Sequence, residues 1–284
     1  MSVSQSAGRR AFASVAQFCA TDSVSSNLKI CLSLITEGAK RGSNMIFFPE
    51  ASDYIASNKT QIAELAEPLS GSFMSAITKS AKENKVWLSI GIHEKTPDSP
   101  KPYNSNVLID DSGEIVSVYR KLHLFKVSIE NGPQLSENHH ILEGLKICPP
   151  VQTPVGKLGL AICYDVRFPE LASTLRDMGA HGITYPSVFT EKTGAAHWDV
   201  LMRARAIETQ TYVYASAQIG NHNHKRSSYG NSMIVDPWGT VIARCPLDTN
   251  PCLSTAEINL DYLELVRSQL PVYNSKRLDI FNSS

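Results

Sequence analysis

The amino-acid sequence predicts an α/β fold in four layers, an αββα sandwich built from two similar β-α-β-α-β-β-β halves. One observation behind this prediction is that the same order of apolar runs and helical repeats occurs twice along the 284 residues. Another is that each half closes with a similar hairpin turn, in which Asp110 and Gly113 correspond to Asp236 and Gly239. A sheet with helices on one face leaves its other face uncovered, and packing two such sheets together buries both.

The first half alternates apolar runs with segments of helical periodicity. Short apolar runs predict buried strands, and apolar residues at helical spacing predict amphipathic helices. Gly42 follows the first helical segment, as is common at the end of a helix. We expect strands at 11–18, 45–48 and 86–92, helices at 28–39 and 73–81, and a hairpin that joins 107–109 to 115–119.

The second half repeats this order. Pro169 and Gly179 delimit its first helix, because proline is tolerated at the first turn and glycine is favoured past the end. The residues from about 261 to 284 predict a short helix and an extended tail, and the whole chain, 1–284, is expected to form a single domain. We expect strands at 158–162, 183–188 and 212–219, helices at 169–178 and 198–207, and a hairpin of 233–235 with 241–243.

The overall charge balance excludes some classes of protein. The chain has 27 Lys and Arg against 27 Asp and Glu, whereas a dedicated nucleic-acid binder would be basic. No apolar stretch approaches the roughly 18 residues that a membrane-spanning helix needs. The first ten residues are rich in serine and contain two arginines, so a mitochondrial location is an alternative to the expected cytoplasmic one.

Three residues with reactive side chains follow predicted strands. Glu50 comes directly after Met45-Ile46-Phe47-Phe48-Pro49, Lys121 comes after 115–119, and Cys163 comes after 158–162. In α/β sheets, functional sites gather beyond the carboxyl ends of the strands. The sequence therefore predicts one site that contains a carboxylate, an ammonium and a thiol.

Cys163 has the most informative surroundings of the six cysteines. It stands between a strand and the helix that begins at Pro169, so we expect it at a tight turn near unpaired backbone N–H groups. Such donors stabilise an oxyanion and favour a thiolate, so a lowered thiol pKa is expected. Inert burial is the interpretation that fits Cys19, Cys31 and Cys148.

Other chemistries fit the sequence less well. A papain-like pair of Cys163 with His123 or His197 lacks the sequence that surrounds such a nucleophile. The spacings of His222, His224, Cys245 and Cys252 fit no standard zinc motif. No phosphate-binding loop and no dinucleotide-binding glycine motif is present. We therefore expect neither a metal nor another cofactor.

The sequences around the three reactive residues resemble a known family. They are Phe48-Pro49-Glu50, Tyr119-Arg120-Lys121-Leu122-His123-Leu124-Phe125 and Gly159-Leu160-Ala161-Ile162-Cys163-Tyr164-Asp165-Val166-Arg167-Phe168-Pro169-Glu170. They resemble the three ordered signatures of the carbon–nitrogen hydrolase (nitrilase) superfamily, and the resemblance covers nearly the whole chain. It implies an αββα sandwich and a homodimer or larger homo-oligomer. The segments 189–198 and 203–210 resemble the Nit branch, and within it the deaminated-glutathione amidases.

The resemblance implies a role for each residue of the site. Cys163 matches the nucleophile, Glu50 the general base and Lys121 the lysine on the oxyanion side. Glu137, in Leu135-Ser136-Glu137-Asn138, is the best match to a second family glutamate. Lys126 departs from the pattern, because many relatives carry Asp at that position, so the rim of the site differs in charge.

The expected substrate is a small primary amide that bears carboxylates, similar to deaminated glutathione and cleaved to acid and ammonia through a cysteine thioester. The alternatives are an ω-amidase acting on 2-oxoglutaramate or 2-oxosuccinamate, and a non-enzymatic role as partner of a Fhit-type hydrolase. Arg167 is suited to a substrate carboxylate, and its alternative is a salt bridge with Asp165 or Glu170. The candidate substrate-binding residues are Tyr54, Tyr164, Arg167, Thr190, Thr193 and His197.

Overall fold

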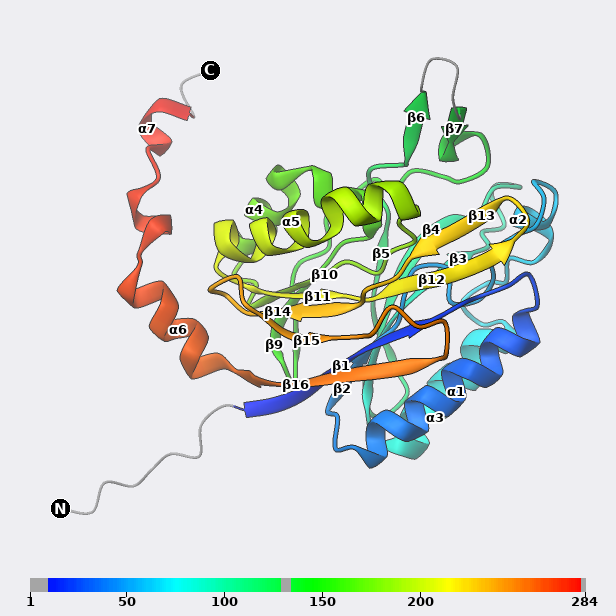
Figure 1. The fold of residues 1–284 in the computed structure, drawn as a ribbon, viewed down its shortest axis with the longest axis horizontal. Helices are drawn as coiled ribbons and strands as arrows, with labels where there is room; N and C mark the ends of the chain where they lie inside the picture. The colour runs from blue at the N-terminus through cyan, green and yellow to red at the C-terminus, as the bar shows by residue number, and fades with distance from the viewer. Residues whose placement is uncertain (1–9, 129–133, 282–284) are drawn as a thin grey trace.

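Two β-sheets pack face to face, and helices cover their outer faces (Figure 1). The computed structural model describes residues 10–128 and 134–281, so the serine-rich start of the chain lies outside the described residues. The helix–sheet–sheet–helix layering predicted from the sequence is confirmed.

The elements of the first half match those expected from the sequence. A single-turn helix, α2, is the one addition among the described residues of this half. The elements are β1 (Arg10–Phe18), α1 (Val24–Lys40), β2 (Met45–Phe47), α2 (Gln61–Glu64), α3 (Ser72–Asn84), β3 (Trp87–Glu94), β4 (Tyr103–Ile109) and β5 (Ile115–Arg120).

A small hairpin and a 3-10 turn, which stand apart from the two large sheets, precede the second half: β6 (Lys126–Ser128), β7 (Gln134–Ser136) and η1 (Glu137–His139). The second half begins with β8 (Val151–Thr153), β9 (Gly156–Leu160), η2 (Cys163–Arg167), α4 (Pro169–Asp177), β10 (Gly182–Thr184), α5 (Glu191–Thr209) and β11 (Tyr212–Ala215). The remaining elements are β12 (Ala217–Asn223), β13 (Arg226–Tyr229), β14 (Met233–Val235), β15 (Val241–Arg244), β16 (Cys252–Asn259), α6 (Leu260–Gln269), η3 (Val272–Ser275) and α7 (Leu278–Phe281).

The two sheets repeat the same strand order, as the sequence predicts. In the first sheet β1, β2 and β3 are parallel neighbours, and β4 and β5 follow as antiparallel strands. In the second sheet β9, β10 and β11 are parallel, and β14 and β15 follow in the same antiparallel way. The order β1-β2-β3-β4-β5 thus corresponds to β9-β10-β11-β14-β15.

The halves also exchange strands, which was not expected from the sequence. The expected single strand at 212–219 is wrong, because the chain leaves the second sheet after β11 and joins the first sheet as β12, parallel to β1. Ser216 lies at this crossing and donates a hydrogen bond of 2.8 Å to Phe47 O. β16 pairs with β1 in antiparallel register. The expected strand at 183–188 ends early, at Thr184.

Alternation along the strands places the core on both sides of the first sheet. In β2, Met45 and Phe47 face the second sheet, whereas Ile46 belongs to the cluster that packs under α1 and α3. Phe47 stacks on Tyr214 of β11 with ring centroids 4.2 Å apart. This contact between sheets confirms that their uncovered faces are packed together.

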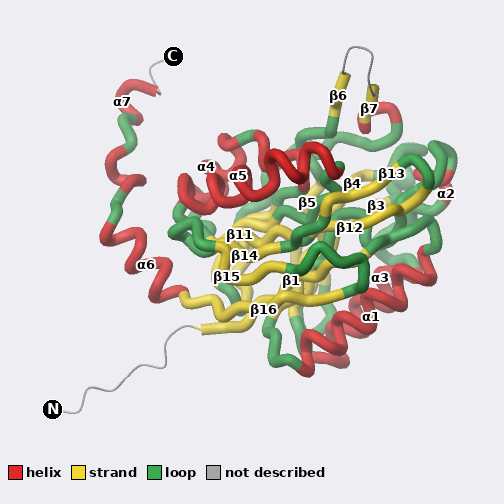
Figure 2. The backbone as a smooth tube through the Cα atoms, viewed as in Figure 1, coloured by secondary structure: helices red, strands yellow, loops and turns green. Residues whose placement is uncertain are grey.

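The C-terminal helices extend away from the sandwich, as Figure 2 shows for α6 and α7. Tyr273 of η3 ties this arm to α4, since its hydroxyl donates to Ser173 O and its ring lies under the Arg176 guanidinium. None of the helices in the described ranges is long and apolar enough to cross a membrane.

Candidate active site

Lys121 joins two carboxylates at one buried point between the sheets. Its Nζ donates to Glu50 Oε1 at 2.9 Å and to Glu137 Oε2 at 3.0 Å. The Lys121 side chain is 1% exposed and that of Glu50 is 5% exposed. The thiol of Cys163 lies close enough to Glu50 to help lower the pKa of its carboxyl. Residues 50, 121 and 137 therefore form one hydrogen-bonded group, and the thiol of residue 163 lies beside it.

The end of β2 delivers Glu50 to this point. Phe48 N donates to Ser89 O and Gly91 N donates to Pro49 O, so pairing with β3 continues past the strand. A Cβ on Gly91 would lie 2.5 Å from the Cα of Glu50. The close approach of the two backbones therefore needs a glycine on β3.

The turn that carries Cys163 has unusual backbone geometry. Cys163 has a φ of 44°, in the left-handed region that non-glycine residues rarely adopt. Its N–H donates to Pro186 O at 2.9 Å, at the end of β10. The N–H of Val188 points at the sulfur. The tight turn expected between strand and helix is confirmed, and it aims the thiol at the end of the neighbouring strand.

Glu137 is held by the backbone of the segment that follows Lys121. Phe125 N donates to Glu137 Oε2 at 2.9 Å, and Glu137 N donates to Phe125 O at 3.0 Å. This reciprocal pair fixes the carboxylate at the start of η1, where it faces the ammonium. Glu137 is half-buried, whereas the other members of the group are buried.

The charges in the group support one another. Burial alone would lower the pKa of Lys121, but the charges of Glu137 and Glu50 outweigh it, and the pKa lies well above its usual value. Burial alone would raise the pKa of Glu50, but Lys121 and the side-chain amide of Asn104 outweigh it and lower the pKa. Near neutral pH the lysine is therefore an ammonium and Glu50 a carboxylate.

The expectation of a lowered pKa for the Cys163 thiol is wrong. Burial raises its pKa, and the negative charge of Glu50 raises it further. The charge of Lys121 and the N–H of Val188 offset part of this effect. The expectation rested on the N–H donors of the turn, whereas burial, which disfavours a charged sulfur, is not visible in local sequence. The resting nucleophile is a thiol next to a carboxylate.

A second buried carboxylate ties the Lys121 segment to the Cys163 turn. Asp165 Oδ2 accepts the Tyr119 hydroxyl at 2.7 Å and Ile162 N at 2.9 Å. Asp165 Oδ1 lies 2.7 Å from His123 Nδ1 and accepts His123 N at 3.1 Å. This role of Asp165 was not predicted, although an Asp two residues after a candidate nucleophile was a usable signal.

Several candidates for substrate binding gather beside this turn. Arg167 Nη2 lies 3.1 Å from His197 Nδ1, and its guanidinium lies over the rings of Tyr164 and Phe189. The alternative salt bridge of Arg167 with Asp165 or Glu170 is not among the ion pairs of the described residues. Thr190 caps α5 by accepting a hydrogen bond from Thr193 N. The two threonine hydroxyls also bond each other.

Tyr54, another candidate for substrate binding, is fully buried. It stacks on His93 and donates its hydroxyl to Ile62 O at 2.6 Å. Its place in a substrate pocket stays a prediction. Lys126, which departs from the family pattern, is exposed.

The other chemistries find no support in the arrangement of side chains. In the residues that the structure describes, no group of three or more His, Cys, Asp or Glu is placed to hold a metal ion. His123 pairs with Asp165 and His197 with Arg167 rather than with the thiol.

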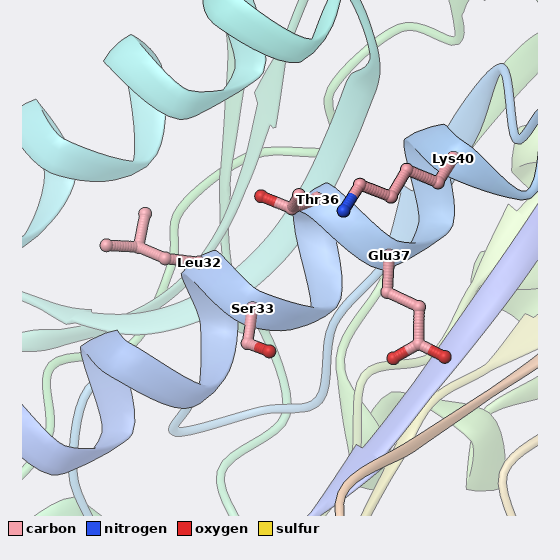
Figure 3. A pocket seen from close by; sticks show the side chains of 5 residues that line it. All are labelled: Leu32, Ser33, Thr36, Glu37 and Lys40. Atoms are coloured by element: carbon pink, nitrogen blue, oxygen red, sulfur yellow. The ribbon is translucent and has the colours of Figure 1, made fainter.

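A shallow hollow lies on the surface of α1 (Figure 3). It is formed by Leu32, Ser33, Thr36, Glu37 and Lys40 and contains no site residue.

Comparison with known proteins gives a consistent result. The carbon-nitrogen hydrolase family matches residues 12–268. The "Probable hydrolase nit2" of Schizosaccharomyces pombe is 49% identical over 272 residues, which cover 95% of this chain and 98% of the relative. The human deaminated glutathione amidase is 45% identical over 287 residues, covering 100% of this chain and 87% of the relative.

A solved structure agrees with these sequence relatives. The Caenorhabditis elegans NitFhit protein superposes with a TM-score of 0.92 at 41% identity. The match covers 96% of this chain and 66% of that protein. The family match spans most of the sequence and includes every residue of the buried Glu–Lys–Glu–Cys group. The chain therefore belongs to the carbon–nitrogen hydrolase family.

Proposed function

We propose that the protein is an amidase that hydrolyses a small, carboxylate-bearing primary amide through a thioester on Cys163. The observation that carries this proposal is the buried group in which Glu50 lies beside the thiol of Cys163 and accepts a hydrogen bond from the ammonium of Lys121. A base, a nucleophile and a fixed positive charge at one buried point are what acyl transfer requires.

In the first half-reaction, Glu50 takes the thiol proton as the sulfur attacks the amide carbonyl carbon. The oxygen of the tetrahedral intermediate is stabilised by Lys121 Nζ and the N–H of Tyr164. The Tyr164 amide is assigned because the N–H groups of Cys163 and Asp165 already donate to Pro186 O and Ile162 O. Protonated Glu50 then gives its proton to the departing ammonia, and the thioester remains.

In the second half-reaction, Glu50 accepts a proton from a water that attacks the thioester carbonyl carbon. Protonated Glu50 returns this proton to the departing sulfur, so the thiol is restored and the acid is released. Glu137 keeps the ammonium of Lys121 in place through both steps, since both of its oxygens accept hydrogen bonds from Nζ. The raised thiol pKa fits this scheme, because the proton leaves only when a substrate is present to be attacked.

Arg167 and His197 are the groups that we assign to a substrate carboxylate. Arg167 follows Cys163 by four residues, and the His197 ring holds its guanidinium beside the aromatic rings of Tyr164 and Phe189. An arginine can bind a carboxylate through two parallel hydrogen bonds. Thr190 and Thr193 supply hydroxyls at the start of α5, the helix that also carries His197.

The natural substrate is proposed to be similar to deaminated glutathione, because the mammalian relatives at about 45% identity carry that activity in their names. The alternative is an ω-amidase that acts on 2-oxoglutaramate. Comparing kcat/KM for the two amides decides between them: the proposal expects the higher value for deaminated glutathione, and a higher value for 2-oxoglutaramate would reverse the assignment.

The covalent scheme is tested by ammonia release from an amide substrate. Cys163→Ala is expected to fold as the wild type does and to release no ammonia, because the covalent route is lost. Cys163→Ser is expected to be nearly inactive as well. Ammonia release by Cys163→Ala at the wild-type rate would reject the scheme.

We further propose that the chain forms a single domain, assembles as a homodimer or larger homo-oligomer, and works in the cytoplasm. Exposed apolar residues on α5 and in the neighbouring hairpin support assembly, namely Val200, Ile207 and Trp238. Sedimentation of the full chain tests the oligomeric state, and a monomer at micromolar concentration would contradict it.

A further inference from the structure

The side chain of Glu50 is hydrogen-bonded unevenly. Asn104 Nδ2 donates to Glu50 Oε1 at 2.6 Å, and Lys121 Nζ donates to the same oxygen at 2.9 Å. Among the hydrogen bonds of the described residues, these two donors share Oε1 and neither reaches Oε2. Since the thiol of Cys163 lies beside the carboxylate, Oε2 is the oxygen left to receive its proton.

Asn104 contacts both the base and the segment that carries the lysine. Its side-chain amide bonds Glu50, and its backbone O accepts Lys121 N at 2.9 Å. It lies on β4, opposite His93 of β3, with 5% of its surface exposed. One residue of the sheet therefore fixes the distance between the general base and the ammonium.

This arrangement leaves one polar atom of Asn104 without a hydrogen bond. Its Oδ1 is buried and has no hydrogen-bond partner among the described residues. A buried polar atom without a partner destabilises the folded state. A side chain chosen for stability alone would avoid this loss, so the position is better explained by what the amide does for Glu50.

Asn106, two residues along the same strand, shows how a buried asparagine with a structural role is hydrogen-bonded. Its Nδ2 donates to Thr184 Oγ1 at 2.6 Å and to Ala161 O at 3.3 Å. Its Oδ1 accepts the Ser89 hydroxyl at 2.8 Å. Asn106 is thus satisfied at both ends and bridges the two sheets, whereas Asn104 is satisfied at one end and contacts the base.

We infer that Asn104 is a positioning residue for the reaction, which orients Glu50 so that Oε2 faces the Cys163 thiol and keeps the carboxylate ionised. This inference rests on the proposed role of Glu50 as the general base. The titratable groups that face Glu50 are Lys121 after β5, Cys163 in η2 and, through the lysine, Glu137 in η1. None of these is altered in the variants below.

The expected signature lies in the pH dependence of Cys163 alkylation. Its acid limb, the range in which the rate falls as Glu50 becomes protonated, should shift. The donor from Asn104 favours the ionised form of Glu50, so its removal raises the pKa at which the base is lost. Asn104→Ala should move the acid limb upward by roughly one pH unit. Asn104→Asp, which has the same shape, should move it further, because a second carboxylate beside Glu50 makes ionisation of both unfavourable.

The experiment measures alkylation of Cys163 by iodoacetamide against pH, read by peptide mass spectrometry on the full chain, with the thermal midpoint measured in parallel. The pH of the acid limb is expected to rise in the order wild type, Asn104→Ala, Asn104→Asp. The thermal midpoint of Asn104→Ala should stay close to that of the wild type. Asn106→Ala is the matched control: it should lower the midpoint and leave the acid limb in place.

Two outcomes would overturn the inference. One is an acid limb that stays in place in both Asn104 variants. The other is an alkylation rate that falls only in proportion to lost folded protein, which would make Asn104 a structural residue. Glu50→Gln, measured alongside, separates a failure of this inference from a failure of the proposed function. If that variant retains the wild-type profile, the base assignment fails; if it loses the limb while the Asn104 variants keep theirs, only the present inference fails.

Discussion

Two buried carboxylates lie next to the Cys163 turn, and they are held in different ways. Asp165 has both oxygens occupied, by Tyr119 and Ile162 on one side and by His123 on the other. Glu50 has its two side-chain donors, Asn104 and Lys121, on one oxygen. A carboxylate whose two oxygens both accept hydrogen bonds has a structural role. A carboxylate with one oxygen free beside a thiol can accept a proton.

The largest difference between the two carboxylates is expected in activity. Glu50→Gln should lower kcat/KM by about 10²–10⁴-fold, the usual contribution of a general base, because the amide cannot accept the thiol proton. Because the amide also removes the negative charge beside the buried ammonium of Lys121, the thermal midpoint should fall as well, and the rate is therefore compared per folded protein. Steady-state ammonia release checks this, and a loss below tenfold would remove Glu50 from the chemistry.

The next effect is expected in stability, at Asp165. Asp165→Asn should lower the free energy of unfolding by about 2–4 kcal/mol, because an NH₂ group then meets donors that the carboxylate had accepted. Urea unfolding measures this loss. Tyr119→Phe, which removes one of the donors, should cost about 1 kcal/mol.

The outcome at Asp165 bears directly on the comparison. Both Asp165→Asn and Tyr119→Phe should leave the acid limb of the alkylation profile where it is in the wild type, because the donors to Glu50 are untouched. A stable Asp165→Asn protein with a shifted limb would reverse the roles assigned to the two carboxylates.

A smaller effect is expected at the rim. Arg167→Ala should raise KM for a carboxylate-bearing amide by about tenfold with kcat nearly unchanged, since the carboxylate contact is equal in the ground and transition states. An amide without a carboxylate should be unaffected. Arg176, which stacks on Tyr273 at the other end of α4, is the control arginine. An equal loss for both amides would argue against the contact.

The smallest effect concerns stability in acid. The folded-state pKa of Glu50 is lowered, so its contribution to stability is complete above its unfolded pKa of about 4.3 and is lost as pH falls through the lower folded value. The free energy of unfolding of the wild type should therefore decline more steeply below about pH 4.3 than that of Glu50→Gln. Parallel slopes in urea titrations at several acid pH values would contradict this.

Much of the fold and of the site could be predicted from local sequence. The repeated order of elements gave the layers, and strand ends gave Glu50, Lys121 and Cys163, because apolar runs mark strands wherever they lie. The crossing at Ser216 could not be predicted, since β11 and β12 form one apolar run that divides between two sheets. β16 was missed because its alternation is carried by small and polar residues.

The error about the thiol has a physical cause. The thiol pKa depends on burial, which the spacing of residues does not reveal. Asn104 contacts Glu50 across 54 residues of sequence, and Asp165 contacts Tyr119 across 46, so neither contact could be predicted from local sequence. A hint was available in the consecutive polar residues 104–106, which interrupt an otherwise apolar strand and signal buried hydrogen bonds.

The most direct test of the account is to trap the acyl group. The protein is mixed with the amide, quenched in acid within the first turnovers, and digested for peptide mass spectrometry. We predict one adduct, on the peptide that contains Cys163, with the mass of the amide less ammonia, and no such adduct in Cys163→Ala. An acyl group on a different residue, or turnover by Cys163→Ala, would contradict the central claim that this thiol carries the substrate.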